Sequence, residues 1–195
     1  MTVSVRRGDE PDFWAIAQIW VRSWQVGYAG IVPQAVLDGL DPVLRHRFLV
    51  ERATDPDNDS ELLVATGSGI DCQLTPCDAH SPVAGFAMIG PWRDADGSPA
   101  GDGAGEIRAM YVSPDKWRSG LGRALMGRAE ARLDALGHAE QRLWVLAAND
   151  RGRRFYESAG WEFDGSRQDY HTGGLVLPEV RYARACDRQG SWRRG

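Results

Sequence analysis

The spacing of hydrophobic residues changes several times along the first half of the chain, and each change marks a predicted element. Residues 3–6 alternate apolar and polar side chains, which indicates a strand. Asp9 and Pro11 then form a typical helix start. Apolar residues follow it at the spacing of one helix face: Phe13, Ile16, Ala17 and Trp20. Further helices are expected over 34–40 and 42–51, and further strands over 61–66 and 82–90.

A strand, a glycine-rich turn and a helix follow one another after residue 105. The strand is apolar up to Pro114, and the helix is predicted to end at Gly137. Apolar residues recur at helical period along this helix: Leu121, Leu125, Ala129, Leu133 and Leu136. A second strand, up to 147, completes a β-α-β unit whose two strands are parallel. Because the flanking strands are spaced like hairpins, the sequence predicts a mixed α/β (α+β) sheet.

Segments rich in glycine, proline and aspartate separate these elements. Residues 67–81 and 91–105 are predicted to be surface loops between strands, and the second is expected to be mobile. The last residues, 187–195, have no apolar face and are predicted to form a flexible tail. A length of 195 residues with 43% hydrophobic content suits one core, so we expect a single domain over 1–186.

The turn between strand and helix has the chemistry of an anion site. Gly120 and Gly122 let the backbone approach a ligand closely, and the free N–H groups of the helix's first turn point outward. Arg118 and Arg123 flank the turn and offer forked donors to phosphate oxygens. The segment therefore predicts a pyrophosphate-binding loop.

Two common phosphate motifs do not fit this loop. A P-loop needs a lysine and a hydroxyl residue after its second glycine, but Gly127 is followed by Arg128 and Ala129. A dinucleotide fingerprint needs a third glycine where the chain has Leu125. Nucleotide hydrolysis and hydride transfer are therefore not predicted.

Residues 117–122 resemble the acyl-coenzyme A signature of the GNAT superfamily of N-acetyltransferases, Gln/Arg-x-x-Gly-x-Gly/Ala. Trp117 stands where the family more often has glutamine or arginine. Residues 143–161 resemble the family's strand, asparagine turn, Phe-Tyr helix and Gly-aromatic exit. The resemblance implies the GNAT fold, with about six to seven strands, about four helices and a parallel strand pair that splays apart to form the coenzyme A cleft.

The same resemblance implies how acetyl-CoA is held. The pantetheine arm would pair with backbone groups of Met110 and Val112, on the first of the two splayed strands. The residues implied to contact coenzyme A are Met110, Tyr111, Val112, Arg118, Ser119, Gly120, Leu121, Gly122, Arg123 and Asn149. Asn149 has a second interpretation as the cap of a helix that starts at Asp150, and both roles can hold together.

Amine acylation needs a group that takes a proton from the ammonium and a donor for the departing thiolate. One branch of the superfamily has its glutamate base at the position of Glu106, which makes this residue the first candidate, either directly or through an ordered water. The alternative is a strand glutamate paired with an arginine such as Arg108. In other branches a glutamate stands on the next strand, where this chain has Trp144.

Tyr156 matches the tyrosine that donates a proton to the coenzyme A sulfur in many family members. A phenol stays protonated at neutral pH and can donate as the sulfur gains charge. The alternative is an aromatic residue that packs beside Phe155 in the core. Glu106 and Tyr156 are thus the candidate catalytic residues.

Composition limits partners and location. A formal net charge of −4 disfavours nucleic acid, and the start of the chain has no apolar segment typical of a signal peptide. No stretch is apolar enough to cross a membrane, and three cysteines do not suggest a disulfide framework. We expect a cytoplasmic protein, and a homodimer is left open. Cys72, Cys77 and His80 lack a fourth ligand for zinc, so no metal is predicted.

The sequence therefore predicts an N-acetyltransferase that uses acetyl-CoA and acts on a primary amine by direct attack in a ternary complex. The identity of the acceptor is left open between a small amine and a protein N-terminus or lysine. Trp24, Tyr28 and His171 are the candidates for its site, although His171 also suits a solvated loop position. The alternative function is an acyl-CoA sensor or protein-binding module with the same fold and no catalysis.

Overall fold

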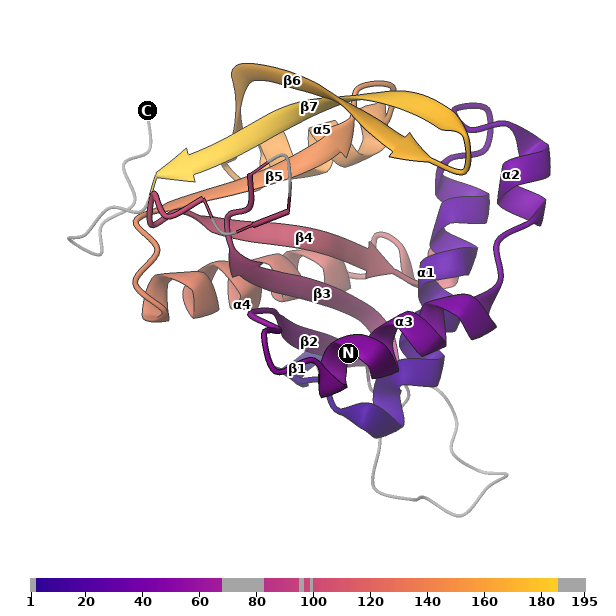
Figure 1. Ribbon diagram of the computed structural model, residues 1–195, viewed down its shortest axis with the longest axis horizontal. Helices are drawn as coiled ribbons and strands as arrows, with labels where there is room; N and C mark the ends of the chain where they lie inside the picture. The colour runs from indigo at the N-terminus through magenta and orange to yellow at the C-terminus, as the bar shows by residue number, and fades with distance from the viewer. Residues whose placement is uncertain (1–2, 68–82, 95–96, 99, 186–195) are drawn as a thin grey trace. The chain divides into compact units, whose positions relative to one another are not determined.

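Seven strands of the described chain form one mixed sheet. The structure is a computed structural model that describes residues 3–67, 83–94, 97–98 and 100–185 (Figure 1). The strands are β1 (Val3–Arg7), β2 (Glu61–Gly67), β3 (Val83–Pro91), β4 (Gly105–Val112), β5 (Glu140–Leu146), β6 (Glu162–Thr172) and β7 (Leu175–Ala185). Their order across the sheet is β1-β2-β3-β4-β5-β7-β6. The helices are α1 (Phe13–Gly27), α2 (Gln34–Asp38), α3 (Pro42–Thr54), α4 (Leu121–Ala135) and α5 (Asp150–Ser158).

The predicted elements are confirmed, with one difference in the helices. The described chain has five α-helices, whereas the family resemblance implies about four, and the helices expected over 34–40 and 42–51 are present as α2 and α3. Asp41 begins α3 by accepting a hydrogen bond from the Val43 amide at 2.8 Å, and Pro42 takes the first helical position. The predicted loop beyond Gly67 up to residue 81 and the predicted tail over 187–195 lie outside the described residues.

The backbone divides into two compact units. The first comprises the described residues up to 88 together with 109–128. Within it, β1 is antiparallel to β2, and α1 and α3 lie side by side (Figure 1). Its core contains apolar residues of α1, α3, β2 and β3: Phe13, Ile16, Ile19, Leu49, Val64, Phe86 and Met88. The helical face predicted from Phe13 and Ile16 is therefore buried as expected.

The second unit comprises the described residues of 89–108 and those from 129 onward. In it, β5 is antiparallel to β7, and β7 is antiparallel to β6. Paired residues share a face of the sheet, so Leu143 and Tyr182 lie together on one face, and Trp144 and Arg181 lie together on the other. Helix α5 covers the first of these faces, where the rings of Tyr156 and Tyr182 are 6.1 Å apart.

The parallel pairing of β4 and β5 is brief. Gly105 lies opposite Gln141 and Glu106 opposite Arg142, and within the described part of this unit the register goes no further. Such a short register agrees with a parallel pair whose strands separate beyond Glu106.

The connection between β3 and β4 is more ordered at its base than its composition predicts. The Trp92 amide donates to the Ala104 carbonyl at 2.9 Å, and the Ala100 amide donates to the Trp92 carbonyl at 2.9 Å. The Trp92 side chain is buried. The prediction of a surface loop therefore holds for its tip, where Gly101 and Asp102 are exposed, but not for its base.

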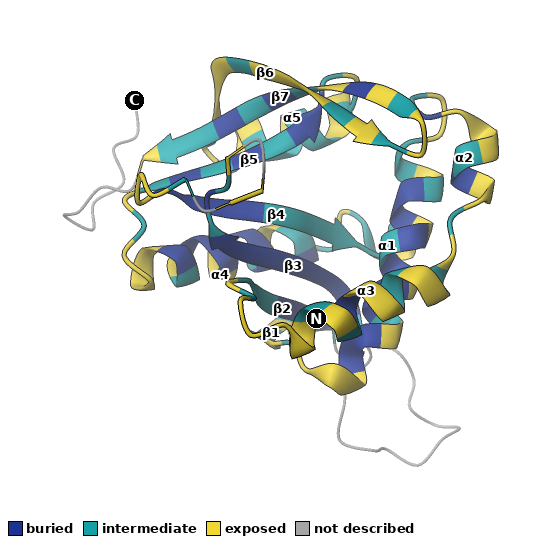
Figure 2. Cartoon of the chain, viewed as in Figure 1, coloured by how far each residue is buried: buried dark blue, intermediate teal, exposed yellow. Residues whose placement is uncertain are grey.

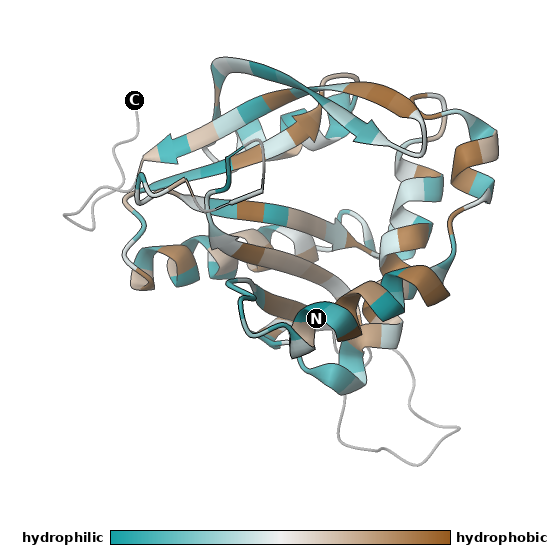
Figure 3. Ribbon diagram, viewed as in Figure 1, coloured by the Kyte–Doolittle hydropathy of each residue, from teal (hydrophilic) through white to brown (hydrophobic). Residues whose placement is uncertain are grey.

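Strand β6 is the free edge of the second unit. Most of its residues are exposed and hydrophilic (Figures 2 and 3). A register shift interrupts its pairing with β7 between Phe163 and Arg167. Charged side chains and bulges on an edge strand discourage pairing with another sheet, so this edge is protected in a common way.

Candidate functional site

The predicted anion loop lies between the end of β4 and the start of α4. Gly120 has a φ of +89° and Arg118 a φ of +64°, both in the left-handed region. Glycine adopts this conformation without strain, whereas arginine does so at a cost. The requirement for Gly120 is therefore conformational, and the unusual backbone of Arg118 was not predicted from the sequence.

Side chains hold this loop against the end of β4. The indole Nε1 of Trp117 donates to the Val112 carbonyl at 2.8 Å, and the Ser119 hydroxyl donates to the Lys116 carbonyl at 2.6 Å. The Val112 carbonyl also accepts a bond from the Ser23 hydroxyl at 3.2 Å. Trp117 thus anchors the loop through its side chain, at the position where the family more often has glutamine or arginine.

The loop presents donors that are free to bind an anion. The first helical bond of α4 runs from the Ala124 amide to the Gly120 carbonyl at 3.0 Å, so the amides of residues 121–123 have no helical partner. Arg118 and Arg123 are exposed, and within the described part of the chain neither guanidinium forms an ion pair. Amides at a helix start together with unpaired arginines favour phosphate.

Two acceptor candidates lie beside a residue of β4. The Trp24 Nε1 donates to the Tyr111 hydroxyl at 2.9 Å, and the rings of Trp24 and Tyr28 meet edge to face at 4.9 Å. The structure therefore brings Trp24, Tyr28 and Tyr111 together. His171 lies on β6 opposite Val176 and is exposed, which agrees with a solvated position in the hairpin.

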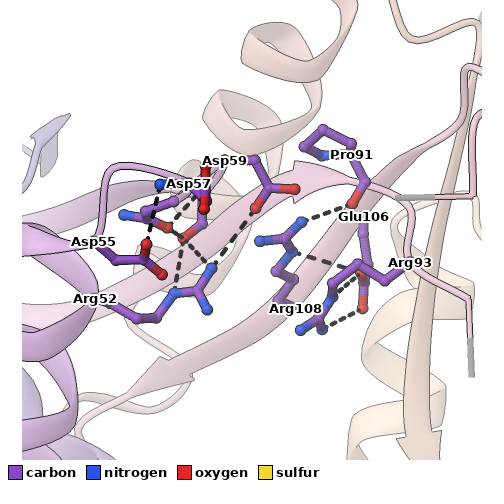
Figure 4. Close-up of polar contacts among 10 residues, drawn as sticks. Arg52, Asp55, Asp57, Asp59, Pro91, Arg93, Glu106 and Arg108 are labelled. Carbon is purple, nitrogen blue, oxygen red and sulfur yellow. Dashed lines mark hydrogen bonds and ion pairs between the residues drawn. The ribbon is translucent and has the colours of Figure 1, made fainter. Parts of the chain in front are cut away.

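Glu106 is buried and paired with arginine (Figure 4). Arg93 donates from Nε to Oε2 at 2.9 Å and from the second guanidinium nitrogen to Oε1 at 3.0 Å. Arg108 lies 3.6 Å from Oε2 and donates to the Pro91 carbonyl at 2.8 Å. This geometry favours the ion-pair interpretation of Glu106, with Arg93 as a partner that the sequence did not indicate. An incoming ammonium group would therefore have to share the carboxylate of Glu106 with Arg93.

A second carboxylate shares this face of the second unit. Glu179 lies opposite Leu146 and is half-buried. Its Oε2 accepts a hydrogen bond from the Gln168 amide nitrogen at 2.8 Å. Burial raises the pKa of the Glu179 carboxyl, the Gln168 hydrogen bond lowers it in part, and the charge of Glu106 raises it again. Sequence reasoning missed Glu179, because only strand register places it on the face of Glu106.

Asn149 and Tyr156 lie at the two ends of the short helix α5. The Asn149 side chain accepts a bond from the Gly152 amide at 3.0 Å, so its predicted capping role is confirmed. A side chain at Gly152 would collide with Asn149, since its Cβ would lie 2.5 Å from the amide nitrogen. Tyr156 meets the ring of Phe155 at 5.4 Å, so its predicted packing contact is also present.

Comparison with known proteins decides the family. The sequence model of the Acetyltransferase (GNAT) family matches residues 44–161, which is more than half of the chain. The chain belongs to this family. Its strand order and parallel β4–β5 pair are consequently those of a GNAT acetyltransferase.

Relatives of this GNAT protein span nearly its whole length. The uncharacterized N-acetyltransferase YuaI of Bacillus subtilis is 28% identical over 179 residues, which are 91% of this chain and 90% of YuaI. The PaiA N-acetyltransferase of Thermoplasma acidophilum, solved in complex with coenzyme A, superposes with a TM-score of 0.67 at 19% identity, over 93% of this chain and 100% of PaiA. YncA of Salmonella typhimurium, solved with acetyl-CoA, gives 0.63 at 20% identity, over 98% of each chain. The two structures support the fold.

Two further predictions concern metals and membranes. Within the described residues, the GNAT chain has no group of three or more histidine, cysteine, aspartate or glutamate side chains able to hold a metal. Cys72, Cys77 and His80 lie outside those residues. No helix in the described part of the chain is both long and apolar enough to span a bilayer.

Proposed function

We propose that this GNAT acetyltransferase transfers the acetyl group of acetyl-CoA to a primary amine by direct attack in a ternary complex. The observation that carries the proposal is the loop between β4 and α4. There, two exposed arginines, which have no acidic partner among the described residues, flank Gly120 and the amides of a helix start. Membership of the family and the coenzyme A found in PaiA support the same cofactor.

The pyrophosphate of acetyl-CoA is proposed to bind residues 118–123, with Met110, Tyr111 and Val112 along the pantetheine arm and Asn149 as a further contact. The Val112 carbonyl already accepts bonds from Ser23 and Trp117. Backbone pairing with the arm at this residue would therefore use the Val112 amide. The N–H and C=O groups of Met110 point to the same edge of β4 as those of Val112, so both are available for this pairing.

Tyr156 is proposed to protonate the coenzyme A sulfur. The proton of the ammonium leaves to a carboxylate or to a water that a carboxylate orders, and Glu106 is the candidate that the sequence indicates for this role. Its two bonds to Arg93 favour a positioning role for Glu106 instead. On the acceptor side, Trp24 and Tyr28 are proposed to line the site, and a net charge of −4 favours a cationic acceptor.

Calorimetry with acetyl-CoA and thiol release with a panel of amines test this function. We expect acetyl-CoA to bind the wild-type chain, and free thiol to appear only when a suitable amine is present. R118A and R123A should each weaken acetyl-CoA binding about 5- to 50-fold, because each removes a charge-assisted contact to phosphate. R128A is the matched control, since Arg128 is also exposed on α4 but lies beyond its first turn.

The outcomes separate the two functions considered. Acetyl-CoA binding without thiol release for any amine would favour the non-catalytic sensor. An absence of acetyl-CoA binding, or equal effects of R118A and R128A, would contradict the proposed loop.

A further inference from the structure

We propose that Glu179 binds the ammonium group of the acceptor and accepts its proton. The inference rests on the proposed function and assigns its missing base to a residue of β7. It also defines the substrate class as an amine that arrives in its protonated, cationic form.

Strand register places Glu179 on the face of the sheet that carries Glu106. Glu106 lies opposite Arg142 on β5, and Glu179 lies opposite Leu146 on the same strand. Arg142 and Leu146 are four residues apart on β5, and side chains of a strand alternate, so both point to one face. Trp144, between them, shares this face and lies opposite Arg181.

The opposite face of this unit is occupied by helices. Tyr182 donates from its hydroxyl to Glu157 of α5 at 2.6 Å, and Gln141 donates to the Glu130 carbonyl of α4 at 3.0 Å. Residues on that face, such as Leu143, are buried. The face of Glu179 is instead covered in part by the Trp92 ring, which lies 6.0 Å from that of Trp144, and Trp144 and Glu179 are themselves only half-buried.

Four arginines of this unit are paired with other acids. Arg93 and Arg108 contact Glu106, Arg142 contacts Asp102 and Glu140, and Arg181 contacts Asp164. Within the described residues Glu179 has no cationic partner, and its one hydrogen bond comes from a neutral amide, that of Gln168. A half-buried carboxylate without a cationic partner lowers the free energy of unfolding, and such groups are common at functional sites.

Glu179 suits a base better than Glu106 does. Both oxygens of Glu106 accept hydrogen bonds from Arg93, whereas among the residues that the structure describes only Oε2 of Glu179 accepts one. Its Oε1 can therefore accept a bond from an ammonium group. Burial and the charge of Glu106 raise the pKa of Glu179, which brings its proton affinity closer to that needed at neutral pH.

The protons balance as follows. One proton passes from the ammonium nitrogen to Glu179, and the resulting amine attacks the thioester carbonyl carbon. A C–N bond forms and the C–S bond breaks, while the sulfur takes a proton from Tyr156. The second proton of the nitrogen is lost to water, and so is the proton that Glu179 accepted. Tyr156 then takes a proton back from water. The net products are the amide, the thiol of coenzyme A and one proton.

The variant E179Q tests the inference, because glutamine keeps the shape and can still accept the bond from Gln168. We expect kcat/KM for the best amine of the panel to fall about 100-fold or more at neutral pH, with loss of the acidic limb of the pH profile. Acetyl-CoA binding should stay within about twofold of wild type. E162Q is the matched control, because Glu162 is exposed on β6 and should leave all three quantities unchanged.

Two further measurements exclude a merely structural role. Replacing Gln168 by leucine removes a hydrogen bond that favours the ionised form of Glu179, so the acidic limb should move to higher pH. An acid whose pKa is raised on folding destabilises the fold once the pH exceeds that pKa. E179Q should therefore raise the Tm by about 1–3 °C at pH 8 and leave it unchanged at pH 4.

The results are decisive in each case. Wild-type kcat/KM and an intact acidic limb in E179Q would overturn the inference while leaving the acetyltransferase function in place. A lower Tm at pH 8 with a proportionate loss of activity would also overturn it, in favour of a structural glutamate. If the wild-type chain binds acetyl-CoA but releases no thiol with any amine, the proposed function itself fails and takes this inference with it.

Discussion

Arg93 binds both carboxylate oxygens of Glu106, at 2.9 and 3.0 Å. The Glu106 side chain is only 7% exposed, whereas that of Arg93 is 35% exposed. The pair therefore connects the base of the 92–104 segment to the start of β4. Two parallel bonds from one guanidinium fix geometry as well as charge, which suits a positioning role for this glutamate.

The substitution E106Q should lower stability more than it lowers the rate of chemistry. It leaves Arg93 and the buried Arg108 without their common anion, which we expect to cost about 2 kcal/mol in the free energy of unfolding. Urea unfolding measures this cost, and a double-mutant cycle with Arg93→Gln should give a coupling of about 1–2 kcal/mol. Unchanged stability together with a 100-fold loss of kcat would instead support Glu106 as the base, because a loss of that size is typical when a general base is removed.

Tyr156→Phe should lower kcat about 10- to 1,000-fold with little change in acetyl-CoA affinity, because it removes only a donor used in the transition state. Tyr182→Phe is the matched control. The Tyr182 hydroxyl donates to Glu157 and accepts from Arg153 at 3.3 Å, so its loss should lower the Tm and spare kcat. Steady-state thiol release and thermal unfolding distinguish the two. Wild-type turnover in Tyr156→Phe would remove Tyr156 from the mechanism.

Asp12 should stabilise the fold at neutral pH and lose this effect at acidic pH. Its burial would raise its pKa, but hydrogen bonds from Arg6, at 2.7 Å each, and from the Asp9 amide lower the pKa from 3.8 to about 2. A carboxyl whose pKa is lowered on folding stabilises the protein above its unfolded pKa, and the benefit disappears as the pH falls towards 2.

Asp12→Asn should therefore lower the free energy of unfolding by about 2 kcal/mol at pH 7 and by much less at pH 2. Urea unfolding of both proteins at several pH values gives the difference, which isolates Asp12 from the other acids. A penalty that stays constant with pH would show that packing, rather than charge, makes Asp12 important.

Local patterns predicted most of the fold. The strands, the helix face of Phe13 and Ile16 and the turn at Gly120 depend on neighbours within a few residues, so the sequence carries their signal. The start of α3 after Asp41 is also a local feature, since a capping aspartate before a proline begins a new helix. These features could be placed without knowledge of the rest of the chain.

Side-chain partners that come from distant elements could not be predicted in this way. Arg93 reaches Glu106 only because Trp92 and Ala104 close the base of their connection, and Glu179 shares the face of Glu106 only through the register of β7 on β5. Trp117 has no sequence signal for its bond to Val112. The candidate base therefore had to be found in three dimensions, whereas the candidate anion loop is already indicated by the sequence.

The carbonyl oxygen of Val112 accepts hydrogen bonds from two separate elements of the first unit. Ser23, on α1 beside the aromatic wall of Trp24, and Trp117, in the loop before α4, both hold this one atom. A substitution at either Ser23 or Trp117 therefore alters the surroundings of the same carbonyl oxygen. The residue that carries this oxygen is also the one whose amide is proposed to pair with the pantetheine arm.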